Sequence, residues 1–137
     1  MQNSVIQIRR LSKEDAPELQ KVLEAAPRYS LNVSGELQPK SAADEVFGAL
    51  PEGFDSACKF VFGIELDSQI IGCIDVLRGF PKGNTAMLGL LLLSEKFQGR
   101  GKGRVAYLEF EKYILQWHEI NRVRISVVLT NDEVLGF

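Results

Sequence analysis

The sequence predicts a single domain of mixed α and β structure, on three observations. The chain has 137 residues, of which 45% are hydrophobic and 25% charged, a balance that suits one globular domain with a packed core. Strand-like and helix-like patterns follow one another in the order β, α, α, β, β, β, α, β. Two of these strands are joined by a short turn, which indicates an antiparallel hairpin.

The N-terminal part of the chain is expected to form one strand and one helix. Residues 5–9 alternate and are rich in β-branched side chains, as in a strand. Ser12 and Asp15 have the spacing of a capping box, and apolar residues then recur at helical intervals until Pro27. We therefore expect a helix over about residues 13–26.

The next stretch, residues 28–57, separates the first strand from the second. Residues 27–40 are mixed in character and are expected to form a loop. Ser41 and Asp44 repeat the capping pattern and predict a short helix that is closed by Pro51. A long connection of this kind often carries a binding surface.

Three apolar segments at the centre of the chain, residues 59–66, 70–77 and 85–93, are predicted to be strands. The first two form the hairpin. The third contains almost no polar residue, so we expect it to be buried on both faces. Gly89 within it indicates either a bulge or a close approach by a ligand.

The last predicted elements are a helix at residues 104–117 and a strand at residues 122–129. Large apolar residues three or four positions apart give this helix a broad apolar face, which we expect to be core. Asn131 begins a further helix, but too few residues remain before Phe137 for that helix to be stable alone.

Charge and cysteine content exclude several classes of function. A net charge of −2 argues against general nucleic-acid binding. Cys58 and Cys73 lie in apolar runs and His118 is the sole histidine, so we expect two buried thiols and no metal site. Residues 1–10 have no secretory signal, and the longest apolar run is too short to span a membrane. The expected location is the cytoplasm.

The most distinctive stretch lies between the third central strand and the helix after it, and it reads Gln98-Gly99-Arg100-Gly101-Lys102-Gly103. The first N–H groups of a helix have no partner within the helix, and the helix dipole is positive there. Glycines allow positive φ and a close approach by a ligand. Arg100, Lys102 and Arg104 add side-chain charge. A phosphate or pyrophosphate is the expected ligand, although a plain connecting turn with solvated basic residues explains the same pattern.

Two common nucleotide motifs do not fit this stretch. A Walker loop needs a Ser or Thr after the lysine, but Lys102 is followed by Gly103, and the earlier glycine is misplaced. The dinucleotide fingerprint G-x-G-x-x-G is not matched either.

A glutamine followed by Gly-x-Gly three residues later, after an apolar strand and before a helix, resembles the coenzyme A loop of the GNAT superfamily of acyl-CoA N-acyltransferases. The similarity includes Phe97 before the loop, the hairpin turn at residues 67–72, Asn131 and the order of the elements. It covers nearly the whole chain and is strongest from residue 59 to 131. It implies one domain over residues 1–137 with a central mixed, mostly antiparallel sheet flanked by helices.

The resemblance also implies how acetyl-CoA is held. Backbone N–H groups of the loop hold the pyrophosphate, the strand ending at Leu93 pairs with the pantetheine arm, and an N–H near Leu93 polarises the thioester carbonyl. Asn131 contacts the pantetheine arm or the phosphates from the other side. The expected cofactor-binding residues are Leu91, Leu93, Phe97, Gln98, Gly99, Arg100, Gly101, Lys102, Gly103 and Asn131.

The implied reaction is direct transfer of an acetyl group from the thioester to an amine. The amine must lose a proton before it attacks. Asp75, Glu36 and Glu95 are candidate bases, each explained more simply as a solvated or salt-bridged carboxylate. The family's usual general acid, a tyrosine on the fourth helix, has no counterpart, because no tyrosine follows Tyr113. The catalytic residues stay open.

The family continues with a full fourth helix and two more strands. The expectation is therefore a domain truncated at its C-terminus, or one that a partner protomer completes, as in a homodimer. Several acidic residues would favour a cationic acceptor, though a solvated acidic face explains them equally: Glu36, Asp44, Glu45, Glu52 and Asp55.

Two classes of function remain. The leading one is an acetyl-CoA-dependent N-acetyltransferase acting on a small molecule or a protein. The alternative is a non-catalytic acyl-CoA-binding or interaction domain, which the missing tyrosine and the uncharged residues 87–90 favour. An RNA-contacting module is disfavoured by the net charge of −2.

Overall fold

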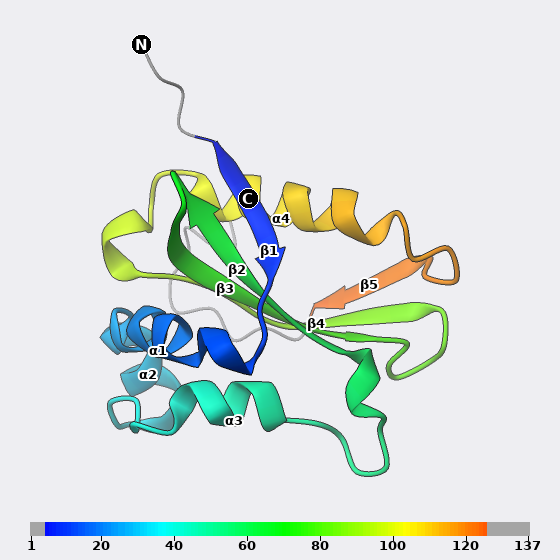
Figure 1. Cartoon of the computed structure of the whole chain (residues 1–137), viewed down its shortest axis with the longest axis horizontal. Helices are drawn as coiled ribbons and strands as arrows, with labels where there is room; N and C mark the ends of the chain where they lie inside the picture. The colour runs from blue at the N-terminus through cyan, green and yellow to red at the C-terminus, as the bar shows by residue number, and fades with distance from the viewer. Residues whose placement is uncertain (1–4, 126–137) are drawn as a thin grey trace.

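The computed structural model describes residues 5–125, which form a five-stranded sheet with helices on both faces (Figure 1). The strands lie in the order β1-β2-β3-β4-β5. β1 to β4 are antiparallel neighbours, and β5 runs parallel to β4. This confirms the predicted mixed, mostly antiparallel sheet. The strands are β1 (Ile6–Arg10), β2 (Lys59–Leu66), β3 (Gln69–Arg78), β4 (Thr85–Leu93) and β5 (Arg122–Ile125).

The helices divide between the two faces of the sheet (Figure 1). Helices α1, α2 and α3 lie on one side, and α4 lies on the other. Short 3₁₀ turns precede α1, β2 and the loop before α4. The helical elements are η1 (Lys13–Asp15), α1 (Ala16–Glu24), α2 (Pro27–Ser34), α3 (Ala42–Gly48), η2 (Ser56–Cys58), η3 (Glu95–Phe97) and α4 (Lys102–Ile114). Within residues 5–125, no helix has the length and apolar character needed to cross a bilayer.

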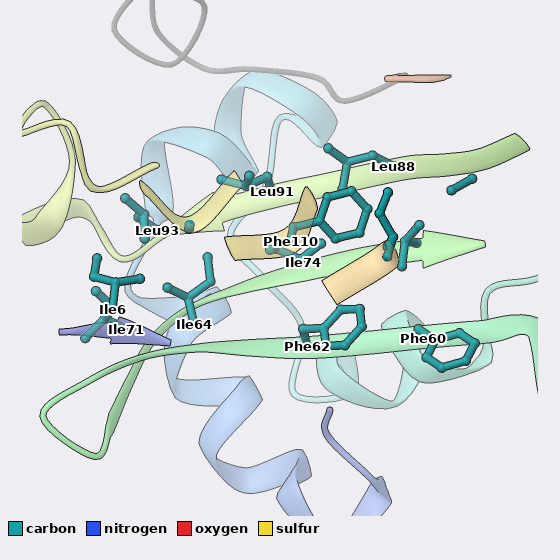
Figure 2. Close-up of a cluster of buried hydrophobic side chains, with 14 of the residues drawn as sticks. Ile6, Phe60, Phe62, Ile64, Ile71, Ile74, Leu88, Leu91, Leu93 and Phe110 are labelled. Carbon is teal, nitrogen blue, oxygen red and sulfur yellow. The ribbon is translucent and has the colours of Figure 1, made fainter. Parts of the chain in front are cut away.

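Each face of the sheet has its own apolar core. Beneath α4, Phe62 and Phe110 are fully buried, and Figure 2 shows Ile74 and Leu88 gathered around them. The Phe62 ring meets Tyr113 edge to face at 4.8 Å, a geometry that aromatic rings favour. The second core packs α1 and α3 against the opposite face of β2, β3 and β4. The predicted burial of β4 on both faces is confirmed, since its side chains enter both cores.

Residues 27–34, predicted to be part of a loop, form helix α2. Pro27 occupies the first turn of this helix, where its missing N–H costs nothing. Gly35 ends it in the left-handed conformation at φ 77°, a common helix stop. The proline that indicated the end of one helix therefore also begins the next.

The other predicted elements agree with the structure apart from their ends. The helix predicted at 13–26 is present as η1 and α1, and the Asp15 carboxylate accepts from the Ser12 N–H at 2.9 Å, as in a capping box. The helix predicted at 104–117 is α4. Of the strand predicted at 122–129, the described part forms β5, and residues 126–129 lie outside the described residues.

Gly89 forms the predicted bulge. Asp75 pairs with Leu90 and Val76 with Leu88, so Gly89 is the extra residue on β4. Such a residue breaks the ladder locally and bends the strand. The prediction of a buried thiol is confirmed for Cys73 and is wrong for Cys58, which is only partly buried.

Candidate functional site

The glycine-rich stretch leads from the end of β4 into the first turn of α4. Gly99 and Gly101 have φ values of 76° and 78°, a left-handed conformation that side chains disfavour. Gly101 is the N-cap of α4. These two glycines let the chain reverse after η3 and present the helix start beside the end of the strand.

The start of α4 offers free hydrogen-bond donors. The N–H of Val105 bonds to the Gly101 carbonyl at 3.3 Å, so the amides of Lys102, Gly103 and Arg104 come before the first intrahelical bond. Arg100 and Arg104 are exposed, and neither they nor Lys102 forms an ion pair within residues 5–125. The loop therefore combines unpaired amides with uncompensated positive charge, which suits an anion.

The Gln98 side chain holds the loop in place. Its Nε2 donates to the Leu93 carbonyl at 2.8 Å, and its backbone N–H donates to the Glu95 carbonyl at 3.1 Å. The side chain thus ties the loop to the end of β4. The sequence pattern indicated a ligand contact by Gln98, but this internal bond explains a glutamine at that position without one.

Leu91 and Leu93 point into the core beneath α4. Both are buried, and a Cβ added to Gly103 would lie 3.9 Å from Leu93 Cδ1 and 4.0 Å from Leu91 Cδ2. These two residues can therefore contact a ligand only through their backbone atoms. Phe97 is half-buried against the same core. Asn131 lies outside the described residues.

The second half of β4 has a described neighbour on one side only. β5 pairs with β4 over Thr85–Leu88, and the pairing with residues 122–125 goes no further. Residues 89–93 pair with β3 alone among the described strands. A strand edge, a reversing loop and a helix start thus follow one another along a continuous path.

Comparison with known proteins identifies the family of this chain. Residues 18–137 match the profile of the acetyltransferase (GNAT) family. The chain belongs to the GNAT acetyltransferase family. No curated protein matches the sequence significantly.

Solved structures share the fold of this member of the GNAT family. An acetyltransferase from Thermus thermophilus is 25% identical with a TM-score of 0.71, over 88% of this chain and 75% of its own. A ribosomal-protein-alanine N-acetyltransferase from Brucella melitensis biovar Abortus 2308 is 12% identical with a TM-score of 0.68, over 96% and 87%. An aminoglycoside N-acetyltransferase in complex with CoA is 14% identical with a TM-score of 0.61, over 99% and 90%.

A cavity of about 320 Å³ lies on the α1–α3 side of the GNAT sheet, between α2, α3 and the β4 bulge. Gly89 and Leu90 line it at the bulge, and Tyr29, Glu45 and Asp75 supply its ionisable groups. Tyr29 belongs to α2, a segment predicted to be part of a loop. The succession of Pro27 and Gly35 around it was the signal for that helix.

Asp75 is the most buried carboxylate at this cavity. Its Oδ1 lies 2.7 Å from Lys59 Nζ, and the Asp75 and Lys59 side chains are 19% and 6% exposed. The Lys59 ammonium donates its hydrogen bond to the Ala49 carbonyl at 2.9 Å, and Oδ1 has no hydrogen-bond partner within residues 5–125. The contact is thus an ion pair that is poorly aligned as a hydrogen bond. Burial raises the pKa of Asp75 above its ordinary value, and Lys59 opposes that shift.

The other two candidate bases are placed differently. The Glu95 carboxylate accepts from the Arg28 N–H at 2.6 Å and pairs with the Arg28 guanidinium at 3.4 Å, so it caps the start of α2. The Glu95 N–H in turn donates to the Ala25 carbonyl at 2.9 Å. Glu36 is exposed and does not line the cavity. Of the three carboxylates, Asp75 alone lines the cavity.

The acidic residues of region 28–57 differ in whether they line the cavity. Glu45 lines the cavity, whereas Glu36, Asp44, Glu52 and Asp55 do not. Asp55 accepts from the Ala57 N–H at 2.9 Å and caps η2. Two acidic groups, Asp75 and Glu45, therefore line the same cavity.

Proposed function

We propose that this protein is an acetyl-CoA-dependent N-acetyltransferase, which moves an acetyl group from the thioester directly to the amine of an acceptor. The observation that carries the proposal is the succession of a β4 edge with no partner beyond Leu88 among residues 5–125, a left-handed glycine turn and free amides at the start of α4. Membership of the GNAT family and the N-acetyltransferases among the structural neighbours support transfer to nitrogen.

Each part of this path has a role toward acetyl-CoA, which supplies the activated acetyl group. The amides of residues 102–104 donate to the pyrophosphate, and the helix dipole favours its charge. Arg100 and Lys102 add up to about 1 kcal/mol each, since both contacts are solvated. The backbone of residues 89–93, which pairs with β3 alone among the described strands, pairs with the pantetheine arm. An N–H of that segment faces the negative charge that develops on the thioester oxygen.

A thermal-shift experiment with acetyl-CoA tests the binding step. At 100 times Kd, a ligand of the native state adds about 2.7 kcal/mol to the free energy of unfolding. With about 2.1 cal/mol/K of unfolding entropy per residue, that energy raises Tm of this chain by roughly 9 °C. An unchanged Tm for the wild-type protein rules out acetyl-CoA binding.

Two glycine variants locate the binding site. Gly101 and Gly53 have similar φ values, 78° and 76°, and a Cβ at either meets no atom within 4 Å. Gly101→Val and Gly53→Val should therefore lose similar stability without ligand, about 1–2 kcal/mol from the left-handed backbone. Only Gly101→Val should lose the acetyl-CoA shift. A full shift in Gly101→Val would show that the loop is not the binding site.

A second function in the same family is a non-catalytic acyl-CoA-binding domain. The uncharged strand segment at residues 87–90 favours it, since no carboxylate lies there. Release of free thiol from acetyl-CoA in the presence of amines separates the two. A thermal shift without thiol release from any amine favours the binding domain.

A further inference from the structure

Asp75 lies where the cavity adjoins the edge of β4, at the Gly89 bulge. It pairs with Leu90 directly beside the Gly89 bulge, and the pairing of β4 with the described part of β5 ends at Leu88. The strand edge proposed for the pantetheine arm therefore begins at Gly89 and Leu90, which line the cavity. A group held in the cavity approaches β4 at this junction.

The cavity walls suit a short hydrocarbon chain. At about 320 Å³, the cavity is at the small end of ligand pockets. Its apolar lining includes side chains from α1, α2, α3 and β4: Leu23, Val33, Ala42, Val46 and Leu90. The polar part of the lining comprises Tyr29, Ser30, Ser34, Gln38, Glu45 and Asp75. The small volume limits the width of an acceptor, and an alkyl chain against the apolar side chains loses water contact favourably.

Four titratable side chains from different elements lie around the Asp75 carboxylate or line the same cavity. Lys59 on β2 forms the ion pair, Cys73 on β3 is fully buried, Tyr29 lies on α2, and the exposed Glu45 lies on α3. Burial makes Asp75 a stronger base than an exposed aspartate, while Lys59 favours its ionised form.

We propose that Asp75 accepts the proton of the acceptor in this cavity, and that the acceptor is a slender aliphatic primary amine. The inference rests on the proposed N-acetyltransferase function. The ammonium first gives a proton to the Asp75 carboxylate. Its nitrogen lone pair then forms the C–N bond with the thioester carbon, and the C–S bond breaks with its electron pair on sulfur. The second proton lost by nitrogen neutralises the thiolate, and Asp75 returns its proton to water.

The test measures thiol release from acetyl-CoA with a series of n-alkylamines from propylamine to hexylamine, and with an aminoglycoside as a bulky comparison. The wild-type protein should prefer the alkylamines. Asp75→Asn should lower kcat/KM at least about 100-fold, the lower end for a general base. It should keep the thermal shift with acetyl-CoA. Asp67→Asn is the matched control, since the same change in the β2–β3 turn should leave kcat/KM within twofold.

Lys59→Met provides an independent measurement if Asp75→Asn does not fold. Without the ammonium, the pKa of Asp75 rises. The fall of kcat/KM at low pH, its acid limb, should therefore shift to higher pH, and activity should recover at pH values above the raised pKa. Loss of packing alone would lower the whole profile without moving the limb. Unchanged kcat/KM in Asp75→Asn, an unmoved limb in Lys59→Met, or a preference for the aminoglycoside would overturn the inference. A wild-type protein that binds acetyl-CoA but acetylates no amine would refute the proposed function itself.

Discussion

Replacing Gly72 by alanine probes the closest contact between β3 and β4. A Cβ built on Gly72 lies 2.4 Å from the Leu92 carbonyl oxygen, 2.8 Å from Leu93 Cδ2 and 3.1 Å from Ile64 Cδ1. The first of these atoms is backbone within the sheet, so it cannot turn aside as a side chain does. We expect the methyl group to force β3 and β4 apart beside the end of the strand edge proposed for acetyl-CoA.

The size of the effect follows from two opposing terms. Overpacking costs about 1–3 kcal/mol, and the upper end applies because two of the contacts are under 3 Å. Loss of glycine freedom in the unfolded chain returns about 0.4–1 kcal/mol. The net loss is about 2 kcal/mol, or roughly 7 °C in Tm for a chain of 137 residues.

Calorimetry of the unliganded protein measures this loss, with Gly89→Ala as the matched control. Gly89 lies in the neighbouring strand, but the nearest atom to its Cβ is the Asp75 carbonyl oxygen at an ordinary 3.8 Å. Gly89→Ala should therefore change Tm by less than about 3 °C. Equal Tm values for Gly72→Ala and the wild-type protein would refute the steric argument, as would an equal drop in both variants.

Two further predictions concern titratable side chains. Burial raises the pKa of the Cys73 thiol to about 12. Ellman's reagent at pH 8 should therefore react with the partly exposed Cys58 in the native protein and with both thiols after denaturation. Rapid reaction of both thiols in the native protein would contradict this. Arg78 donates two hydrogen bonds to Glu119, at 2.5 and 2.9 Å, and holds the pKa of that carboxyl at about 2. Because the unfolded value is near 4.3, the pair stabilises the fold above that pH, and its contribution is lost as the pH falls through about 2. An NMR titration of Arg78→Gln should move the Glu119 midpoint up toward the unfolded value, and an unmoved midpoint would exclude Arg78 as the cause.

Much of the framework could be predicted because its signals are local. Residues 59–66 and 85–93 were predicted as strands with the bounds that the structure has. The turn between β2 and β3 places Asp67 and Ser68 at positive φ, 51° and 69°, as a tight hairpin turn requires. The anion-binding character of the loop at residues 98–103 likewise depends on glycines and a helix start within a few residues of each other.

Helix α2 was missed because local signals decide little for so short a segment. It has 8 residues, below the roughly 12–15 at which an isolated helix is stable in water. Its place is fixed at the start by the Glu95 carboxylate, 67 residues away from Arg28 in the chain, and at the end by Gly35. No pattern confined to residues 27–40 contains the first of these contacts.

The sequence alone determined the order of the strands and of every α-helix except α2 in the described part of the chain, the glycine turn and the family to which they correspond. Turn geometry and strand or helix periodicity depend on near neighbours. Only the tertiary structure decided what the candidate carboxylates do. Glu95 caps the start of α2, while Asp75 is buried beside Lys59 at the bulge. The physical reason is that a carboxylate takes its basicity from burial and from charges on other strands, and these are fixed when the sheet assembles.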